Sequence, residues 1–202
     1  MYNVEILKER VIDRCEICKG AGMVNDKECD CKRKYRVLVN MLMSGFPEEI
    51  VYKIERGEIS KEFDVLKGLE FFKYGVDNYK DFLNSGLGLV FYGSGSVYIA
   101  SFFVFSVLDK DYLIDVGFNR SDKELCVYDL NFGSYDDLER CLSARKSHLK
   151  SSLVCLDNLN ILSSISSSLR DILEWDGKSF CGEIFRGIEV CRKKEVMSRW
   201  KV

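Results

Sequence analysis

Apolar segments alternate with amphipathic segments in the second half of the chain. Continuous apolar runs bounded by turn residues predict strands at residues 87–92, 112–116, 125–128 and 153–156, with a further strand at 184–190. Buried strands that alternate with helices are typical of a parallel sheet that helices cover on both faces. The pattern therefore predicts an α/β domain over residues 85–202.

Helical spacing dominates the segment before this domain. Apolar residues recur there with Lys and Glu between them, at Ile50, Ile54, Ile59, Phe63, Leu66, Leu69 and Phe72. A shorter helix is expected at residues 32–43, because Gly45 and the only proline, Pro47, interrupt the pattern directly after it. We therefore divide the chain into a cysteine knuckle with a basic helix (1–44), a helical linker (45–84) and the α/β domain (85–202).

Residues 82–108 contain no charged side chain, and a stretch of this length could cross a bilayer. Glycine and serine residues between positions 86 and 96 divide it into two apolar halves. A strand, a turn and a buried helix fit that division better than one membrane span. Charged residues also interrupt the first ten positions, so no signal peptide is recognised and a cytoplasmic protein is expected.

The composition is that of a folded globular protein, with 47% hydrophobic and 31% charged residues and a formal net charge of −2. This balance excludes a disordered chain and a protein that binds nucleic acid over its whole surface. The charge is nevertheless unevenly distributed. Residues 109–139 hold nine acids and three bases, whereas residues 32–36 and 192–201 each carry a balance of +4.

Four of the nine cysteines lie within 17 residues, in a Cys-x2-Cys pair and a Cys-x-Cys pair. Gly20 and Gly22 allow the chain to turn sharply after the first pair, and residues 25–27 look like a hairpin tip that returns the second pair. Four thiolates at this spacing are typical of a closed, structural zinc site; reduced thiols or an iron–sulfur cluster are the alternatives. The expected ligands are Cys15, Cys18, Cys29 and Cys31. The other cysteines are expected to be small buried residues: Cys126, Cys141, Cys155, Cys181 and Cys191.

A glycine–serine turn follows the first predicted strand, where a P-loop ATPase holds its phosphates. A working loop needs Gly-x4-Gly-Lys-Ser/Thr, but here the turn is shorter, Ser96 stands at the lysine position and Val97 at the hydroxyl position. Asp157 ends a later apolar strand as a Mg²⁺-binding acid would, and the next residue is Asn158. Hydrolysis of ATP is therefore not expected. Any residual nucleotide site would comprise Gly93, Ser94, Gly95, Ser96, Val97 and Asp157.

The order of these features resembles the bacterial and phage replicative-helicase loaders, the DnaC/DnaI-like AAA+ ATPases. Members often carry a cysteine knuckle of this form, then a basic helix, a Ser-Gly-Ile/Phe-Pro break and a Walker A strand that ends in Tyr-Gly. The matching segments here are the four cysteines, residues 32–36, residues 44–47 and residues 91–93, so that the resemblance covers about residues 12–160. It implies a parallel-sheet P-loop core of AAA+ type, truncated because only 45 residues follow Asp157.

The resemblance further implies a loader-derived subunit that has lost ATP hydrolysis and is not an enzyme. Such a subunit would bind a replicative helicase or an active ATPase homologue, with or without single-stranded DNA, in a replication or mobile-element complex. A zinc-stabilised adaptor with no DNA role and a nucleotide-binding switch with a shortened loop remain as alternatives. The first DNA-contact candidates combine bases with one aromatic ring: Lys32, Arg33, Lys34, Tyr35 and Arg36. Further bases and Trp200 form a second candidate segment at residues 192–200.

Overall fold

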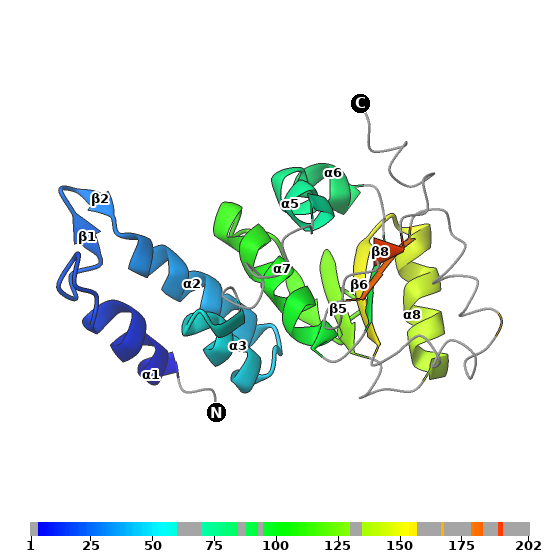
Figure 1. Cartoon of the computed structure of the whole chain (residues 1–202), viewed down its shortest axis with the longest axis horizontal. Coiled ribbons are helices and arrows are strands. Elements are labelled where there is room, and N and C mark those ends of the chain that lie inside the picture. Colours follow the sequence, from blue (N-terminus) through cyan, green and yellow to red (C-terminus); the bar gives the residue numbers. More distant parts are fainter. Residues whose placement is uncertain are drawn as a thin grey trace.

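The structure is a computed structural model that describes residues 4–59, 70–84, 88–92, 95–129, 135–156, 167, 179–183 and 190–191. Its main feature is a six-stranded sheet in the order β4-β5-β6-β3-β7-β8 (Figure 1). Neighbouring strands are parallel except for the last pair, β7 and β8. The strands are β3 (Gly88–Tyr92), β4 (Val116–Phe118), β5 (Leu125–Asp129), β6 (Ser151–Leu156), β7 (Ser179–Glu183) and β8 (Val190–Cys191). The predicted α/β fold with a parallel sheet is confirmed.

One predicted strand is wrong. Residues 111–115 form a turn, and the strand begins only at Val116. The Asp111 carboxylate accepts a hydrogen bond from the Leu113 N–H at 3.2 Å, which closes a local turn that competes with extended structure. Leu113 is 77% exposed, so the apolar side chain that suggested a buried strand points to solvent. Of the strand predicted at 184–190, residue 190 lies in β8, and 184–189 lie outside the described residues.

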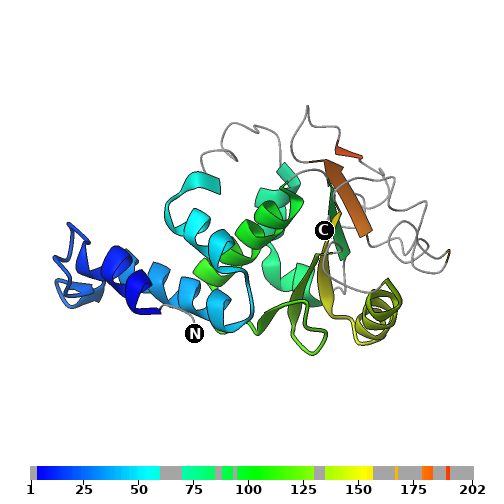
Figure 2. The same ribbon diagram turned by 90° about the horizontal axis from the view of Figure 1, so that it is seen from below.

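Two helices enclose the sheet, α7 (Ser96–Lys110) on one face and α8 (Tyr135–Ser147) on the other (Figures 1 and 2). The uncharged stretch thus becomes the strand β3 followed by the buried helix α7, as predicted, although residues 93 and 94 between them are not described. Within the described residues, no helix is both long and apolar enough to cross a membrane.

Three of the remaining helices, α2, α3 and α5, pack against α7, whereas α6 packs against β6. The N-terminal hairpin precedes α2 and lies at the end furthest from the sheet (Figure 2). One hydrophobic cluster extends from Leu7 through Leu38 and Phe103 to Leu153, across both predicted domain boundaries. The helix predicted at 32–43 is confirmed as α2. The elements are α1 (Val4–Lys8), a π-helical turn (Glu9–Asp13), α2 (Asp30–Met43), α3 (Glu48–Glu55), α5 (Glu70–Asp77) and α6 (Tyr79–Asn84).

The parallel strands β4 and β5 are joined by only six residues, 119–124. Parallel neighbours usually require a crossover of about a dozen residues or more, most often a helix. Arg145 of α8 is only 2% exposed. Its side chain holds this link in place by donating hydrogen bonds to several carbonyl oxygens of the link. The acceptors are the carbonyls of Ser121, Lys123, Glu124 and Ser151 and the hydroxyl of Ser152. Lys150 donates to a fourth carbonyl of the link, that of Asp122, at 2.8 Å.

Candidate metal centre and phosphate-loop region

The four predicted metal ligands lie together at the base of the N-terminal hairpin, on residues that precede and follow its two strands. Their sulfur atoms are all within 4.8 Å of one another. The Sγ atoms of Cys15 and Cys29 are 3.8 Å apart, and those of Cys18 and Cys31 are 3.4 Å apart. Sulfurs bound at about 2.3 Å to one tetrahedral ion would lie about 3.8 Å apart. These four thiols could therefore bind a metal ion such as zinc with little movement.

Several residues around the cysteine cluster have a left-handed backbone conformation, which allows the chain to turn sharply. Lys19, Gly20 and Gly22 have φ values of +50°, +85° and +67°, which turn the chain back after Cys18. The Gly22 N–H donates to the Cys18 Sγ at 3.2 Å, an outer contact that would orient a metal-bound thiolate. The predicted hairpin tip is confirmed: β1 (Met23–Val24) and β2 (Lys27–Glu28) pair in antiparallel fashion around Asn25 and Asp26, both at positive φ.

Two thiols of the cluster have pKa values shifted in opposite directions. Burial raises the pKa of Cys31, and the hydrogen bond to the Cys18 sulfur raises it further. Burial also acts to raise the pKa of Cys18, but hydrogen bonds from Cys31 and from the Gly22 N–H outweigh it and lower that pKa to about 7. One thiolate is therefore accessible near neutral pH, and a bound metal would displace the protons of the others. With four protein ligands the site is closed, which suits a structural role.

Helix α7 begins directly after Gly95, at the end of the sheet where β3 and β6 run side by side. Tyr92 and Leu156 are register partners at the ends of these strands. Gly95, at φ +91°, turns the chain into α7, and the Ser96 hydroxyl donates to the Leu156 carbonyl at 3.2 Å. Ser96 is only 3% exposed. The hydroxyl at the lysine position is thus held by the sheet, and Val97 beside it is half-buried.

The other residues of the predicted nucleotide site, Gly93, Ser94 and Asp157, lie outside the described residues, as does Asn158. The sequence analysis did not single out Asp129, a second acid at this edge of the sheet. It ends β5, is 5% exposed, and its backbone N–H donates a hydrogen bond to the side-chain oxygen of Asn119 at 3.0 Å. The sequence pattern could have identified Asp129, because this acid comes at the end of an apolar run just as Asp157 does.

Replacing Ser96 with alanine is expected to lower the free energy of unfolding by about 1–2 kcal/mol, because the buried Leu156 carbonyl would lose its donor. Urea unfolding followed by circular dichroism measures this loss. Ser147→Ala is the matched control, since the exposed Ser147 hydroxyl bonds only within its own helix; its effect should stay within about 0.5 kcal/mol. Equal effects of the two substitutions would show that the Ser96 bond does not hold α7 to β6.

The predicted DNA-contact residues on α2 have partners within the chain. Arg33 pairs with Asp30 and Asp109, Lys34 donates to the Glu55 carbonyl, and Arg36 pairs with Glu28. Tyr35 packs against the hydrophobic cluster, and Lys32 is exposed. Half-exposed ion pairs contribute little to stability and exchange readily for other charges, so DNA contact by this helix stays a prediction. The second basic segment, 192–200, lies outside the described residues.

Comparisons with protein-family models, with curated proteins and with solved structures found no match. The cysteine cluster, the β3–α7 region and the surface of the described residues are the features that bear on the protein's function.

Proposed function

We propose that this protein is a zinc-bound, non-hydrolysing subunit related to the AAA+ helicase loaders, which acts by binding a replicative helicase or an active ATPase homologue. The main support for the proposed loss of ATP hydrolysis is the hydrogen bond from the Ser96 hydroxyl to the Leu156 carbonyl. Where a working P-loop would offer an ammonium group to the phosphates, this chain offers a buried hydroxyl that is already bound.

Zinc is the proposed metal because four thiolates in a compact, closed arrangement match its preference for tetrahedral sulfur ligation. A P-loop-type core is the proposed origin of the sheet. In its favour, β3 lies inside the sheet between β6 and β7, and α7 starts from its carboxyl end. In open parallel sheets, ligand sites gather at this edge, and the acid at the end of β5 belongs to the same edge.

A zinc-stabilised adaptor without a DNA role is the second candidate, and one observation favours it. Three of the bases proposed for DNA are engaged by acids or carbonyls of the same chain: Arg33, Lys34 and Arg36. Salt-dependent binding of single-stranded DNA separates the two candidates, because a subunit that contacts phosphates loses affinity steeply as salt rises. No salt-dependent binding would favour the adaptor.

The proposed loss of nucleotide chemistry predicts that millimolar Mg·ATP will neither be hydrolysed nor raise the melting temperature. A retained site occupied at about 100 times its Kd would add about 2.7 kcal/mol of stability. For a chain of this length that corresponds to a rise of roughly 5–10 °C. Differential scanning fluorimetry and a phosphate-release assay test this, with an intact helicase loader as positive control.

A rise in melting temperature that disappears in Asp157→Ala would contradict the proposal and support the nucleotide-binding switch. The partner is tested separately, by native mass spectrometry of the protein mixed with the replicative helicase of its host. A complex that contains zinc and no nucleotide is expected. Failure to bind the helicase, with zinc still present, would favour the adaptor.

A further inference from the structure

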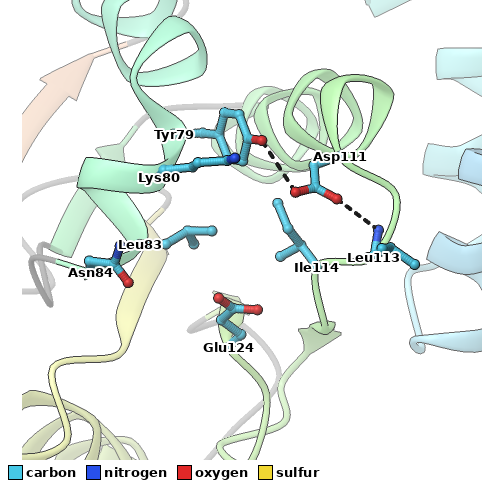
Figure 3. A pocket seen from close by; sticks show the side chains of 8 residues that line it. All are labelled: Tyr79, Lys80, Leu83, Asn84, Asp111, Leu113, Ile114 and Glu124. Carbon is cyan, nitrogen blue, oxygen red and sulfur yellow. Dashed lines mark hydrogen bonds between the residues drawn. The ribbon is translucent and has the colours of Figure 1, made fainter.

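A small open cavity lies near the end of the sheet where the parallel strands β3 and β5 begin. It is bounded by α6 and the turn at residues 111–115 (Figure 3). Its volume is about 230 Å³. Leu83 of α6 and Ile114 of the turn, each 6% exposed, supply its apolar lining. Glu124 enters it from the start of β5. The cavity is smaller than the clefts of roughly 300–1,000 Å³ that take drug-sized ligands, and it suits a single side chain.

Two carboxylates face this cavity from opposite walls, and the backbone positions both of them. Asp111 accepts hydrogen bonds from the Tyr79 hydroxyl and from the Leu113 N–H, each at 3.2 Å (Figure 3). The Glu124 carbonyl is held by the buried Arg145 at 3.0 Å, so the residue that carries the second carboxylate is fixed. Hydrogen bonds to other elements therefore hold both residues in place at the cavity.

Both carboxylates lack a cationic partner, which sets them apart from their neighbours. Within the part of the chain that the structure describes, Asp111 and Glu124 form no ion pair with Lys or Arg. The other acids between residues 109 and 124 are ion-paired: Asp109 with Arg33, Asp115 with Lys123, and Asp122 with Lys123. With one ammonium on the rim, that of Lys80, the cavity lining has a net charge of −1.

Large apolar side chains lie exposed beside the cavity. Leu113, which lines it, is 77% exposed, and Tyr112 is 48% exposed. Asn40 of α2 donates to the Tyr112 carbonyl at 3.3 Å, and Met43, three residues further along this helix, is 64% exposed. Exposed apolar side chains next to a polar cavity are typical of surfaces that bind other proteins.

We propose that this acidic pocket receives the arginine side chain of a protein partner, and that an adjoining apolar residue of the partner packs on Leu113 and Tyr112. A planar guanidinium can donate to carboxylates on two walls at once, whereas the single ammonium of lysine cannot span them as well. The aliphatic part of the arginine would pack on Leu83 and Ile114. Nucleic acid is disfavoured because its phosphates would meet the unpaired carboxylates. The pocket contains none of the residues on which the proposed function rests.

The test uses the full chain and two blocked tetrapeptides, Gly-Arg-Leu-Gly and Gly-Gln-Leu-Gly, titrated in amide NMR spectra at low salt. The arginine peptide should shift the amides of Leu113 and Glu124 in a saturable manner, with a Kd on the order of 1 mM. The glutamine peptide should bind at least tenfold more weakly. Equal shifts from both peptides, or shifts of the same amides by oligothymidylate, would overturn the proposal.

Two variants with the same change in charge locate the binding. Glu124→Gln removes a pocket carboxylate but keeps the carbonyl that Arg145 binds, and it should weaken the arginine peptide about tenfold, on the scale of a charge-assisted hydrogen bond. Asp122→Asn, two residues away, removes a carboxylate that already faces Lys123 and should leave the Kd unchanged. Unchanged binding by Glu124→Gln, or equal weakening in both variants, would refute the pocket as the site.

Discussion

Chelation of the zinc ion proposed for the cysteine cluster is expected to unfold residues 14–31 while the sheet stays folded. This segment has no apolar core of its own: among its described residues, the buried hydrophobic side chains are Cys18 and Cys29, two of the four ligands. Its hairpin consists of two strands of two residues each. Structural zinc supplies an apparent binding free energy of about 10–16 kcal/mol in small zinc-finger peptides, far more than such a hairpin could supply. α1 and α2 bury Leu7 and Val37 against the main cluster and should remain.

Amide NMR spectra before and after addition of a chelator measure this effect. The signals of residues 23–28 should lose dispersion, whereas those of β3, β5 and β6 should keep theirs. Cys18→Ser should abolish stoichiometric zinc, and Cys141→Ser, a substitution outside the cluster, should retain one zinc ion per chain. Unchanged signals of the hairpin after complete removal of the metal would contradict the prediction, and visible absorption of an iron–sulfur cluster would contradict the identity of the metal.

Arg145→Ala is expected to be the most damaging single substitution on α8, with a loss of about 3–5 kcal/mol, because several acceptors would lose their donor at once and each unsatisfied buried acceptor costs about 1–3 kcal/mol. The guanidinium is 2% exposed and is bound by four carbonyls and one hydroxyl. Its removal would leave the buried Ser151 carbonyl and the part-buried carbonyls of the link without these donors. A domain has only about 5–15 kcal/mol of stability in total, so partial unfolding at 37 °C should follow.

Urea unfolding followed by circular dichroism gives the size of this loss. Arg145→Lys keeps the charge, but an ammonium has three donors in place of five and lacks the planar fork, so this variant should recover only part of the stability. Arg140→Ala is the control on the same helix. The Arg140 side chain is 77% exposed in its pair with Asp137, and its loss should cost no more than about 0.5 kcal/mol. Equal midpoints for Arg145→Ala and Arg140→Ala would contradict the role of the buried arginine.

The features that could be predicted from the sequence are those encoded by neighbouring residues. The cysteine spacing and the glycines between the pairs predicted the thiol cluster and its hairpin, because every contact there lies within 17 residues. The apolar runs predicted β3, β5 and β6, since a strand buried on both faces needs apolar side chains throughout. The run at 112–116 misled because the turn depends on a hydrogen bond of Asp111, which outweighed the apolar pattern.

The structural role of Arg145 could not be predicted from the sequence. It belongs to a polar segment with Lys146 and His148 that reads as solvated surface. Its partners are main-chain carbonyls up to 24 residues earlier in the chain. Every residue has the same backbone carbonyl, so the sequence of side chains does not indicate which carbonyls will require a hydrogen-bond donor from elsewhere in the chain. The acidic pocket was hidden for a similar reason, because Asp111 and Glu124 come together only when the turn and β5 are in place.

The six-residue link between β4 and β5 constrains how this chain can diverge. Exposed connections usually accept inserted residues and are common sites of proteolytic cleavage. In this link the side chains of Ser121 and Asp122 are exposed, yet four consecutive carbonyls are anchored from α8 and the residues after it. Homologous chains should therefore vary freely in the side chains of this connection while conserving its length.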